Sequence, residues 1–124
     1  MLNVLGRPLA AYSMIASQKA KHVEKTFIST DSDKLRQLGE SYGAEYIERP
    51  DYLASKEALG EDAFKHGYEV IRERLRSEGE VLEMLCLLMC NAPTVTGEFL
   101  DHGIEQLRAN PNADSAVSVS VYNM

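Results

Sequence analysis

Residues 23–50, VEKTFISTDSDKLRQLGESYGAEYIERP, decide the fold. Residues 23–29 are rich in β-branched and aromatic side chains, which favours a strand. The next four residues, Thr30-Asp31-Ser32-Asp33, carry short oxygen side chains that can accept hydrogen bonds from the free N–H groups at the start of a helix. We therefore expect a strand followed by a capped helix, and we interpret Asp31 as part of the cap rather than as a metal ligand.

The rest of this stretch predicts a short amphipathic helix and a second strand. Apolar residues recur at spacings of three and four and are followed by a glycine, which is typical of a helix and its end: Leu35, Leu38, Tyr42 and Gly43. Residues 44–48 then favour a short strand that Arg49-Pro50 closes. The order of strand, helix and strand indicates an α/β fold with a parallel sheet.

Three further helices are expected outside this stretch. They cover about residues 8–21, 61–79 and 96–110, with Pro8 at the first helical position and Thr96 as an N-cap. The apolar face of the middle helix is expected at Phe64, Tyr68, Ile71 and Leu75.

Two more stretches predict strands. Residues 81–89 are nearly continuously apolar, which is typical of a strand covered on both faces, so we expect the central strand here. The sulfur-containing residues of this region are then core side chains: Met84, Cys86, Met89 and Cys90. Residues 116–122 alternate valine with serine, which predicts a strand with one packed face.

The composition is that of one ordinary folded domain. Of 124 residues, 44% are hydrophobic and 26% charged, and 13 Lys and Arg against 19 Asp and Glu give a net charge of −6. This acidic balance, without a basic cluster, argues against nucleic acid and membrane surfaces as partners. No stretch approaches the roughly 20 apolar residues of a membrane span, and no secretion signal is recognisable, so we expect a cytoplasmic location.

The expected sheet is incomplete. A doubly wound sheet normally starts with a strand that leads into the first helix, whereas only residues 1–5 precede the first helix here. We therefore expect a domain that lacks its first strand and its C-terminal part. The gap would lie between strands 23–29 and 81–89, and a strand borrowed from a second copy would fill it, which predicts a homo-oligomer.

In open α/β sheets, ligands bind beyond the carboxyl ends of the strands. Four clusters are expected there: Ser29-Thr30-Asp31, Arg49-Pro50, Cys90-Asn91-Ala92-Pro93-Thr94 and Tyr122-Asn123. Their hydroxyl, guanidinium, carboxamide and backbone N–H groups suit an anionic ligand rich in hydrogen-bonding groups, such as a nucleotide or a sugar acid. Neither a metal site nor a catalytic residue can be assigned, because the three histidines, His22, His66 and His102, have no partner at a useful spacing.

Six short motifs occur in an order and spacing that resemble one family. They are Gly6-Arg7-Pro8-Leu9, Ser29-Thr30-Asp31, Tyr42-Gly43-Ala44-Glu45, Arg49-Pro50, Asn91-Ala92-Pro93-Thr94 and the sequence DSAVSV at residues 114–119. Together they resemble the cytidylyltransferases that make CMP-activated sugar acids, the acylneuraminate cytidylyltransferase (CMP-N-acetylneuraminate synthetase) group. The resemblance covers nearly the whole chain.

This resemblance implies a three-layer, mainly parallel, Rossmann-like sheet of the nucleotide-diphospho-sugar transferase type. It also implies transfer of CMP from CTP to the hydroxyl of an acidic sugar, with release of pyrophosphate and dependence on Mg²⁺. The family's A-R-x-G-S-K loop, which grips the triphosphate, and its metal-binding aspartates are absent from this chain, so ligands for Mg²⁺ are not expected in it. We expect a single partial nucleotidyltransferase-like domain, residues 1–124, that is inactive by itself. Its remaining nucleotide contacts are expected at Arg49, Asn91, Ala92, Pro93 and Thr94.

A second class of function stays open: a non-catalytic remnant of a cytidylyltransferase that folds, oligomerises or binds nucleotide weakly. Two other α/β modules fit less well. A response-regulator receiver domain needs a phosphorylatable aspartate where Cys90-Asn91 ends the apolar run, and a flavodoxin-like module needs a phosphate loop that Leu5-Gly6-Arg7-Pro8 does not supply. Thermal protection by CTP would separate an enzyme half-site from a remnant that does not bind.

Overall fold

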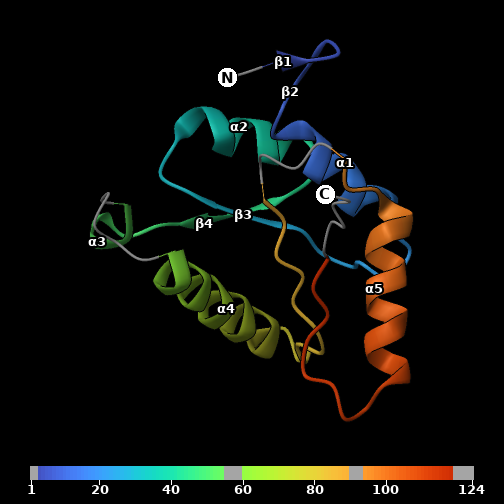
Figure 1. Cartoon of the computed structure of the whole chain (residues 1–124). Coiled ribbons are helices and arrows are strands. Elements are labelled where there is room, and N and C mark those ends of the chain that lie inside the picture. Colours follow the sequence, from blue (N-terminus) through green and yellow to red (C-terminus); the bar gives the residue numbers. More distant parts are fainter. Residues whose placement is uncertain (1–2, 55–59, 90–93, 119–124) are drawn as a thin grey trace, which may run out of the picture.

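The computed structural model describes residues 3–54, 60–89 and 94–118. Within these ranges it is an α/β structure whose small parallel sheet lies between helices (Figure 1). The elements in chain order are β1 (Asn3–Val4), β2 (Arg7–Pro8), α1 (Ala11–Lys19), β3 (Phe27–Thr30), α2 (Asp33–Ser41), β4 (Glu45–Glu48), α3 (Asp51–Ala54), α4 (Gly60–Ser77) and α5 (Gly97–Ala109).

The β3–α2–β4 unit confirms the order of elements expected from residues 23–50, although the first strand begins at Phe27 and not at Val23. Strands β3 and β4 pair in parallel, from Phe27 opposite Glu45 to Thr30 opposite Glu48. Helix α2 stops before Gly43, whose φ of 84° lies in the left-handed region that favours glycine. Because the signals for this unit are local, it folds as its sequence indicates.

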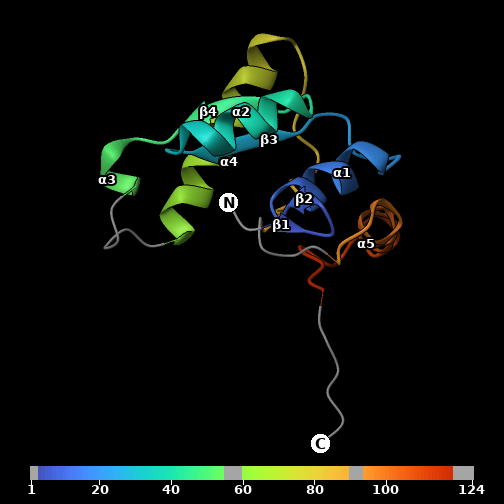
Figure 2. The same ribbon diagram turned by 90° about the horizontal axis from the view of Figure 1, so that it is seen from above.

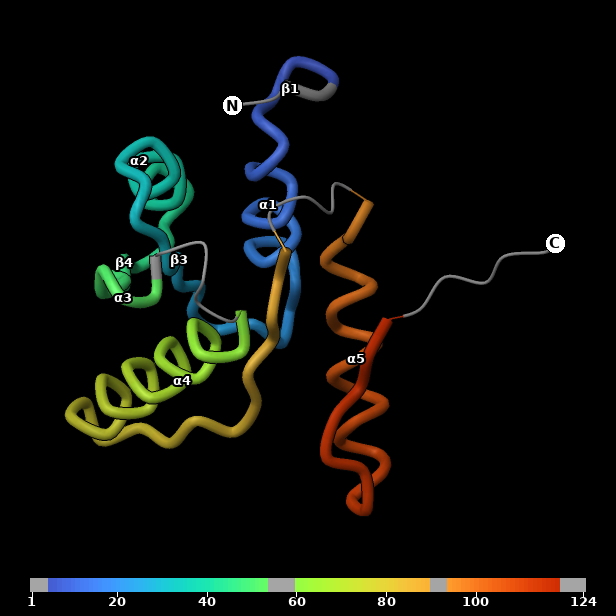
Figure 3. Tube along the Cα trace, turned by 60° about the vertical axis from the view of Figure 1, so that its left-hand side comes forward, coloured from blue at the N-terminus to red at the C-terminus, as the bar shows by residue number. Residues whose placement is uncertain are grey.

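Helices cover both faces of the β3–β4 pair. On one face, Ile28 packs with Met14 of α1 and with Leu35 and Leu38 of α2. On the other, Ile47 packs with Ile71 and Leu75 of α4. Figures 1 and 3 both show α2 and α4 on opposite sides of the strands. Two small apolar clusters, one on each face, therefore form the core of this unit.

The first helix begins later than expected. Arg7 and Pro8 pair with Val4 and Asn3 in an antiparallel hairpin, so Pro8 is in a strand and not at the first helical position. The two turn residues, Leu5 and Gly6, both have positive φ, as a two-residue hairpin turn requires. This hairpin projects from one end of α1, away from the β3–β4 pair (Figure 2).

Helix α4 confirms the expected helix but buries a different face. Its buried residues are Ala63, Gly67, Ile71 and Leu75, whereas Phe64 and Tyr68 are about 40% exposed. The predicted face was therefore right only in the second half of the helix. The two strands are short, and the apolar cluster beneath the helix involves Val70, Ile71 and Leu75, so the sheet covers only that half.

Helix α5 packs along α1, and its expected cap is confirmed. The Thr96 hydroxyl accepts the N–H of Phe99 at 3.2 Å. A Cβ on Gly97 would stand 2.8 Å from the backbone of Lys19 and Ala20, so the start of α5 touches the end of α1 directly. The Asp101 carboxylate accepts the backbone N–H groups of Lys21 and His22 at 2.8 and 2.9 Å.

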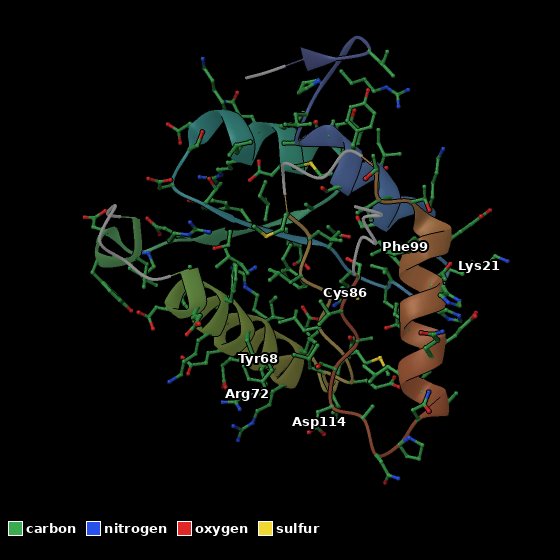
Figure 4. The ribbon with its side chains drawn as sticks, in the orientation of Figure 1. Lys21, Tyr68, Arg72, Cys86, Phe99 and Asp114 are labelled. Atoms are coloured by element: carbon green, nitrogen blue, oxygen red, sulfur yellow. The ribbon has the colours of Figure 1, made fainter. Side chains whose placement is uncertain are left out.

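The expected central strand is not formed. Residues 81–89 have no strand assignment, and Val81, Leu85, Leu87 and Met89 are 46–90% exposed. Cys86 is also exposed, so its prediction as a core thiol was wrong, while Cys90 lies outside the described residues (Figure 4). A continuous apolar run forms a buried strand only beside partner strands, and among the described residues β3 pairs with β4 alone.

The other expected strand, residues 116–122, is described only as far as residue 118. Residues 116–118 are irregular and exposed there, and the remainder lies outside the described residues. Among the helices of the described ranges, none is both long and apolar enough to cross a membrane.

Candidate functional site

The carboxyl ends of β3 and β4 bring two of the four expected clusters together. Thr30 pairs with Glu48 in the parallel register, so Asp31 and Arg49 leave the sheet side by side. The Arg49 guanidinium donates from Nη2 to the Ser29 carbonyl at 2.9 Å and from Nε to the Ser29 hydroxyl at 3.5 Å. Arg49 therefore joins the end of β4 to β3 and is half-buried at this edge.

Arg49 can serve structure and ligand binding at once. A guanidinium carries five N–H donors, and the bonds to Ser29 use two of them. Those bonds fix the plane of the group, which lowers the entropy lost when a planar, charged ligand is bound. The Ser29 anchor was not foreseen from the sequence. The parallel pairing of the two strands could have indicated this contact. It brings Ser29, one residue before the end of β3, close to Arg49, which follows β4.

The turn between β3 and α2 is fixed by its own side chains. The buried Thr30 hydroxyl accepts the N–H of Ser32 at 3.0 Å, and the Ser32 hydroxyl accepts the N–H of Leu35 at 3.4 Å. The helix cap is therefore Ser32, and Asp31, expected to be part of the cap, is exposed beside it. Asp31 is therefore an exposed carboxylate that follows the end of β3.

Strand β4 is held from both faces close to this edge. The Tyr46 hydroxyl donates to the Thr30 carbonyl at 3.2 Å, and the Arg36 guanidinium lies 4.1 Å from the centre of the Tyr46 ring. From the opposite face, Arg74 Nη2 of α4 donates to the Tyr46 carbonyl at 2.9 Å. The strand end that carries Arg49 is thus fixed by α2 and α4.

The remaining expected site residues are only partly described. Thr94 is exposed in a turn before α5, whereas Asn91, Ala92 and Pro93, like the Tyr122-Asn123 cluster, lie outside the described residues. Just before that turn, the Met89 carbonyl accepts a hydrogen bond from the buried Ser13 hydroxyl of α1 at 2.7 Å.

The described residues do not fit a magnesium site. No group of three or more His, Cys, Asp or Glu side chains comes together in the described part of the chain. Asp31 and Glu48 are exposed near the edge, but a hard cation held by the protein needs several oxygen ligands around one point. We therefore assign no role to Mg²⁺ in the chemistry of this edge.

The described nucleophiles and bases are also poorly placed for catalysis. Partial burial raises the pKa of the Cys86 thiol, which lowers its thiolate fraction at neutral pH. The ring of His22 faces Glu105 at 3.0 Å on the far side of α1. A shallow hollow of about 470 Å³ lies at the C-terminal end of α5, bounded among others by Gln106, Asn110 and Val117, well away from Arg49. What the β3–β4 edge offers is an anchored cation and the N-terminal N–H groups of α2, which suit an anion.

Comparison with known proteins gives two related enzymes. The chain is 33% identical over 69 residues, 56% of its length, to N-acylneuraminate cytidylyltransferase of Escherichia coli O18:K1:H7 (strain RS218 / NMEC). It is 26% identical over 124 residues, 99% of its length, to the pseudaminic acid cytidylyltransferase and UDP-2,4-diacetamido-2,4,6-trideoxy-beta-L-altropyranose hydrolase of Helicobacter pylori (strain ATCC 700392 / 26695). The chain is related to the cytidylyltransferases.

This cytidylyltransferase relative spans only a small part of each protein. It covers 16% of the E. coli enzyme and 23% of the H. pylori enzyme. No family model matches the chain. The two matches agree with the resemblance to cytidylyltransferases inferred from the six motifs.

Proposed function

We propose that the chain is part of a nucleotidyltransferase that forms a CMP-sugar and pyrophosphate from CTP and an acidic sugar. The observation that carries this proposal is the match along the whole chain to a protein named as a pseudaminic acid cytidylyltransferase. The N-acylneuraminate cytidylyltransferase match agrees with it, since both names combine a sugar acid with cytidylyl transfer. The parallel β3–β4 pair is compatible with part of the three-layer, Rossmann-like sheet that this function would use.

The proposed nucleotide site is the carboxyl edge of β3 and β4. Arg49 would meet phosphate or base oxygens, and the turn at Asn91, Ala92, Pro93 and Thr94 would complete the contact. The anchoring of Arg49 on Ser29 supports this placement, because it holds a cation at the edge where ligands of open α/β sheets bind.

We further propose that this chain, by itself, transfers no CMP. The described residues present no carboxylate cluster for Mg²⁺, and the sequence lacks the A-R-x-G-S-K loop that grips the triphosphate in the family it resembles. Each of these groups contributes several kcal/mol to lowering the barrier of a phosphoryl-type transfer. With CTP, Mg²⁺ and a panel of sugar acids, we expect pyrophosphate release at background level. The proposal also includes the dependence on Mg²⁺ that the family resemblance implies and the cytoplasmic location expected from the sequence.

A second candidate function is a folded remnant of such an enzyme that oligomerises and does not recognise nucleotide. The exposed apolar residues of 81–89 favour it, because a surface of this kind is typical of a region that associates. The homo-oligomer expected from the sequence belongs to this candidate as well. The two candidates differ in whether CTP stabilises the fold.

Two arginine variants test where the nucleotide binds. Arg49 and Arg74 are both half-buried, and each donates a 2.9 Å hydrogen bond to a backbone carbonyl of the β3–β4 pair. Arg49→Ala should remove most of the rise in melting temperature that CTP gives the native chain, whereas Arg74→Ala should lower the starting melting temperature and keep that rise. If CTP raises the melting temperature of Arg49→Ala as much as that of the native chain, the nucleotide does not bind at Arg49. If CTP stabilises none of the three proteins, the remnant is the better description.

A further inference from the structure

His66 of α4 carries a buried ring nitrogen that has no hydrogen-bond partner. Among the side chains of the described residues, its Nδ1 is the one nitrogen or oxygen atom that is both buried and unpaired. The residue as a whole is half-buried. Folded proteins pair nearly all buried polar atoms, because such an atom has lost its hydrogen bonds to water. The unpaired Nδ1 of His66 therefore calls for a partner that the described chain does not supply.

His66 lies on the side of α4 that faces the strands. His66, Val70 and Arg74 follow one another at spacings of four and so form one stripe along the helix. Val70 packs against the apolar cluster between α4 and the strands, and Arg74 Nη2 donates to the Tyr46 carbonyl of β4 at 2.9 Å. His66 extends this stripe by one turn towards the start of α4.

The direction of α4 places His66 at the carboxyl end of β4. The helix starts on the side of α3, which directly follows β4, and its later turns lie farther from α3 (Figures 1 and 2). Arg74 contacts Tyr46, and His66 stands eight residues earlier, about 12 Å along the helix axis towards α3. Only two residues of β4 follow Tyr46, so this step reaches the end of the strand, where Arg49 leaves the sheet.

Two different elements thus bring a polar side chain to the same edge. Arg49 comes from the end of β4, where its bonds to Ser29 fix the guanidinium. His66 comes from the first half of α4, outside the apolar cluster that covers the second half. A ligand held by Arg49 is in a position to supply the partner that Nδ1 lacks.

We propose that His66 is a further nucleotide-binding residue of this edge, whose Nδ1 donates a hydrogen bond to an oxygen atom of the nucleotide held by Arg49. An imidazole nitrogen can donate, and nucleotides present acceptor oxygens on their phosphates, ribose and base. The inference rests on the proposed function, because it takes the Arg49 edge as the nucleotide site. It adds a residue from a second element to that site.

Two substitutions of His66 separate ligand binding from a structural role. His66→Leu removes the unpaired nitrogen and keeps an apolar side chain of similar size, so the melting temperature of the free chain should stay equal or rise. His66→Asn keeps an N–H donor at the same number of bonds from Cα as Nδ1, so it should retain part of the nucleotide contact. A histidine that only supports the fold would lose stability in His66→Leu.

The experiment measures melting temperatures without ligand and dissociation constants for CTP by calorimetric titration. We expect His66→Leu to bind CTP about tenfold more weakly than the native chain, as the loss of one good hydrogen bond implies. His102 is exposed on α5, and His102→Leu is the matched control that should bind CTP as the native chain does. Repeating the titration with cytidine distinguishes a nucleoside oxygen, for which His66→Leu weakens cytidine as well, from a phosphate oxygen, for which it weakens CTP alone.

Each outcome supports or overturns the proposal. Weaker CTP binding by His66→Leu, with partial recovery in His66→Asn and no loss of melting temperature, supports it. Native affinity in His66→Leu together with weakened binding by Arg49→Ala overturns the role of His66 and leaves the nucleotide site in place. A lower melting temperature of ligand-free His66→Leu overturns it whatever CTP does, and a native chain that does not bind CTP overturns both the role of His66 and the proposed function.

Discussion

Asp101 ties α5 to the chain that follows α1. Its carboxylate accepts the N–H groups of Lys21 and His22, and these hydrogen bonds, with the positive charge nearby, hold the pKa of Asp101 below its ordinary value. A carboxyl whose pKa is lower in the folded than in the unfolded state stabilises the fold above the unfolded pKa of about 4. That contribution is lost as pH falls through the lowered pKa of the folded state.

Asp101→Asn should therefore reduce stability at neutral pH and flatten the loss of stability in acid. The amide offers one acceptor oxygen where the carboxylate offers two, and its NH₂ group would face a backbone N–H. The free energy of unfolding from urea titrations at several pH values measures both effects. Glu105→Gln is the control, because Glu105 contacts only the exposed side of His22 in this region. If the free energy of unfolding fell equally with decreasing pH in Asp101→Asn and in the native chain, this role of Asp101 would be contradicted.

Two glycines of α5 should respond in opposite ways to alanine. A Cβ at Gly97 would meet the backbone of Lys19 and Ala20 at 2.8 Å, so Gly97→Ala should push α5 from α1 and cost about 1–3 kcal/mol. A Cβ at Gly103 would meet nothing within 4 Å, so Gly103→Ala should stabilise the helix by about 0.5–1 kcal/mol. Thermal unfolding of both variants measures the difference. Similar effects at the two positions would mean that α5 does not touch α1 as described.

The N-cap of α2 leads to a prediction about the stability of a whole helix. Ser32 accepts the N–H of Leu35, whereas Asp31 stands outside the helix, so Ser32→Ala should cost about 1 kcal/mol of stability. Asp31→Ala should stay within about 0.5 kcal/mol, as surface substitutions usually do. Chemical denaturation of the pair measures the difference. A larger loss of stability in Asp31→Ala than in Ser32→Ala would show that Asp31 is the helix cap.

The elements also show what the sequence could predict. The β3–α2–β4 unit follows from signals that lie within a few residues of their effect: hydroxyl side chains at the helix start, Gly43 at its end and β-branched residues in the strand. The hairpin was missed because Pro8 suits the first position of a helix as well as a short edge strand.

The prediction of a central strand at residues 81–89 was wrong. An apolar run becomes a buried strand only when partner strands from distant parts of the chain lie beside it, and the run itself does not encode them. Val81 is 90% exposed although residues 81–89 contain one charged residue, Glu83, and are otherwise apolar. At the candidate site, only the placement of the strand ends could be predicted from the sequence. Arg49 and the end of β3 were placed at one edge because parallel strands fix their carboxyl ends together, whereas the contact of Arg49 with Ser29 needs the register.

At the scale of the whole molecule, one anchored arginine and one exposed apolar segment lie on different surfaces. Arg49 stands at the end of β4 on one side of α4, and Val81–Met89 runs between α4 and α5 (Figure 1). Nucleotide binding and self-association should therefore be separable. Leu85→Lys is expected to weaken self-association and to leave the stabilisation by CTP unchanged. Arg49→Ala is expected to remove the stabilisation by CTP and to leave self-association unchanged.

The melting temperature of the native chain with CTP, UTP and ATP at equal concentrations tests most directly whether the chain has a site for cytidine nucleotides. At ten times its dissociation constant, a ligand that binds only the folded state stabilises it by about 1.4 kcal/mol, which raises the melting temperature by a few degrees at this size. We predict that CTP raises it more than UTP or ATP does, because the chain is related to cytidylyltransferases. No shift with any of the three, or an equal shift with all of them, would contradict a site for cytidine nucleotides.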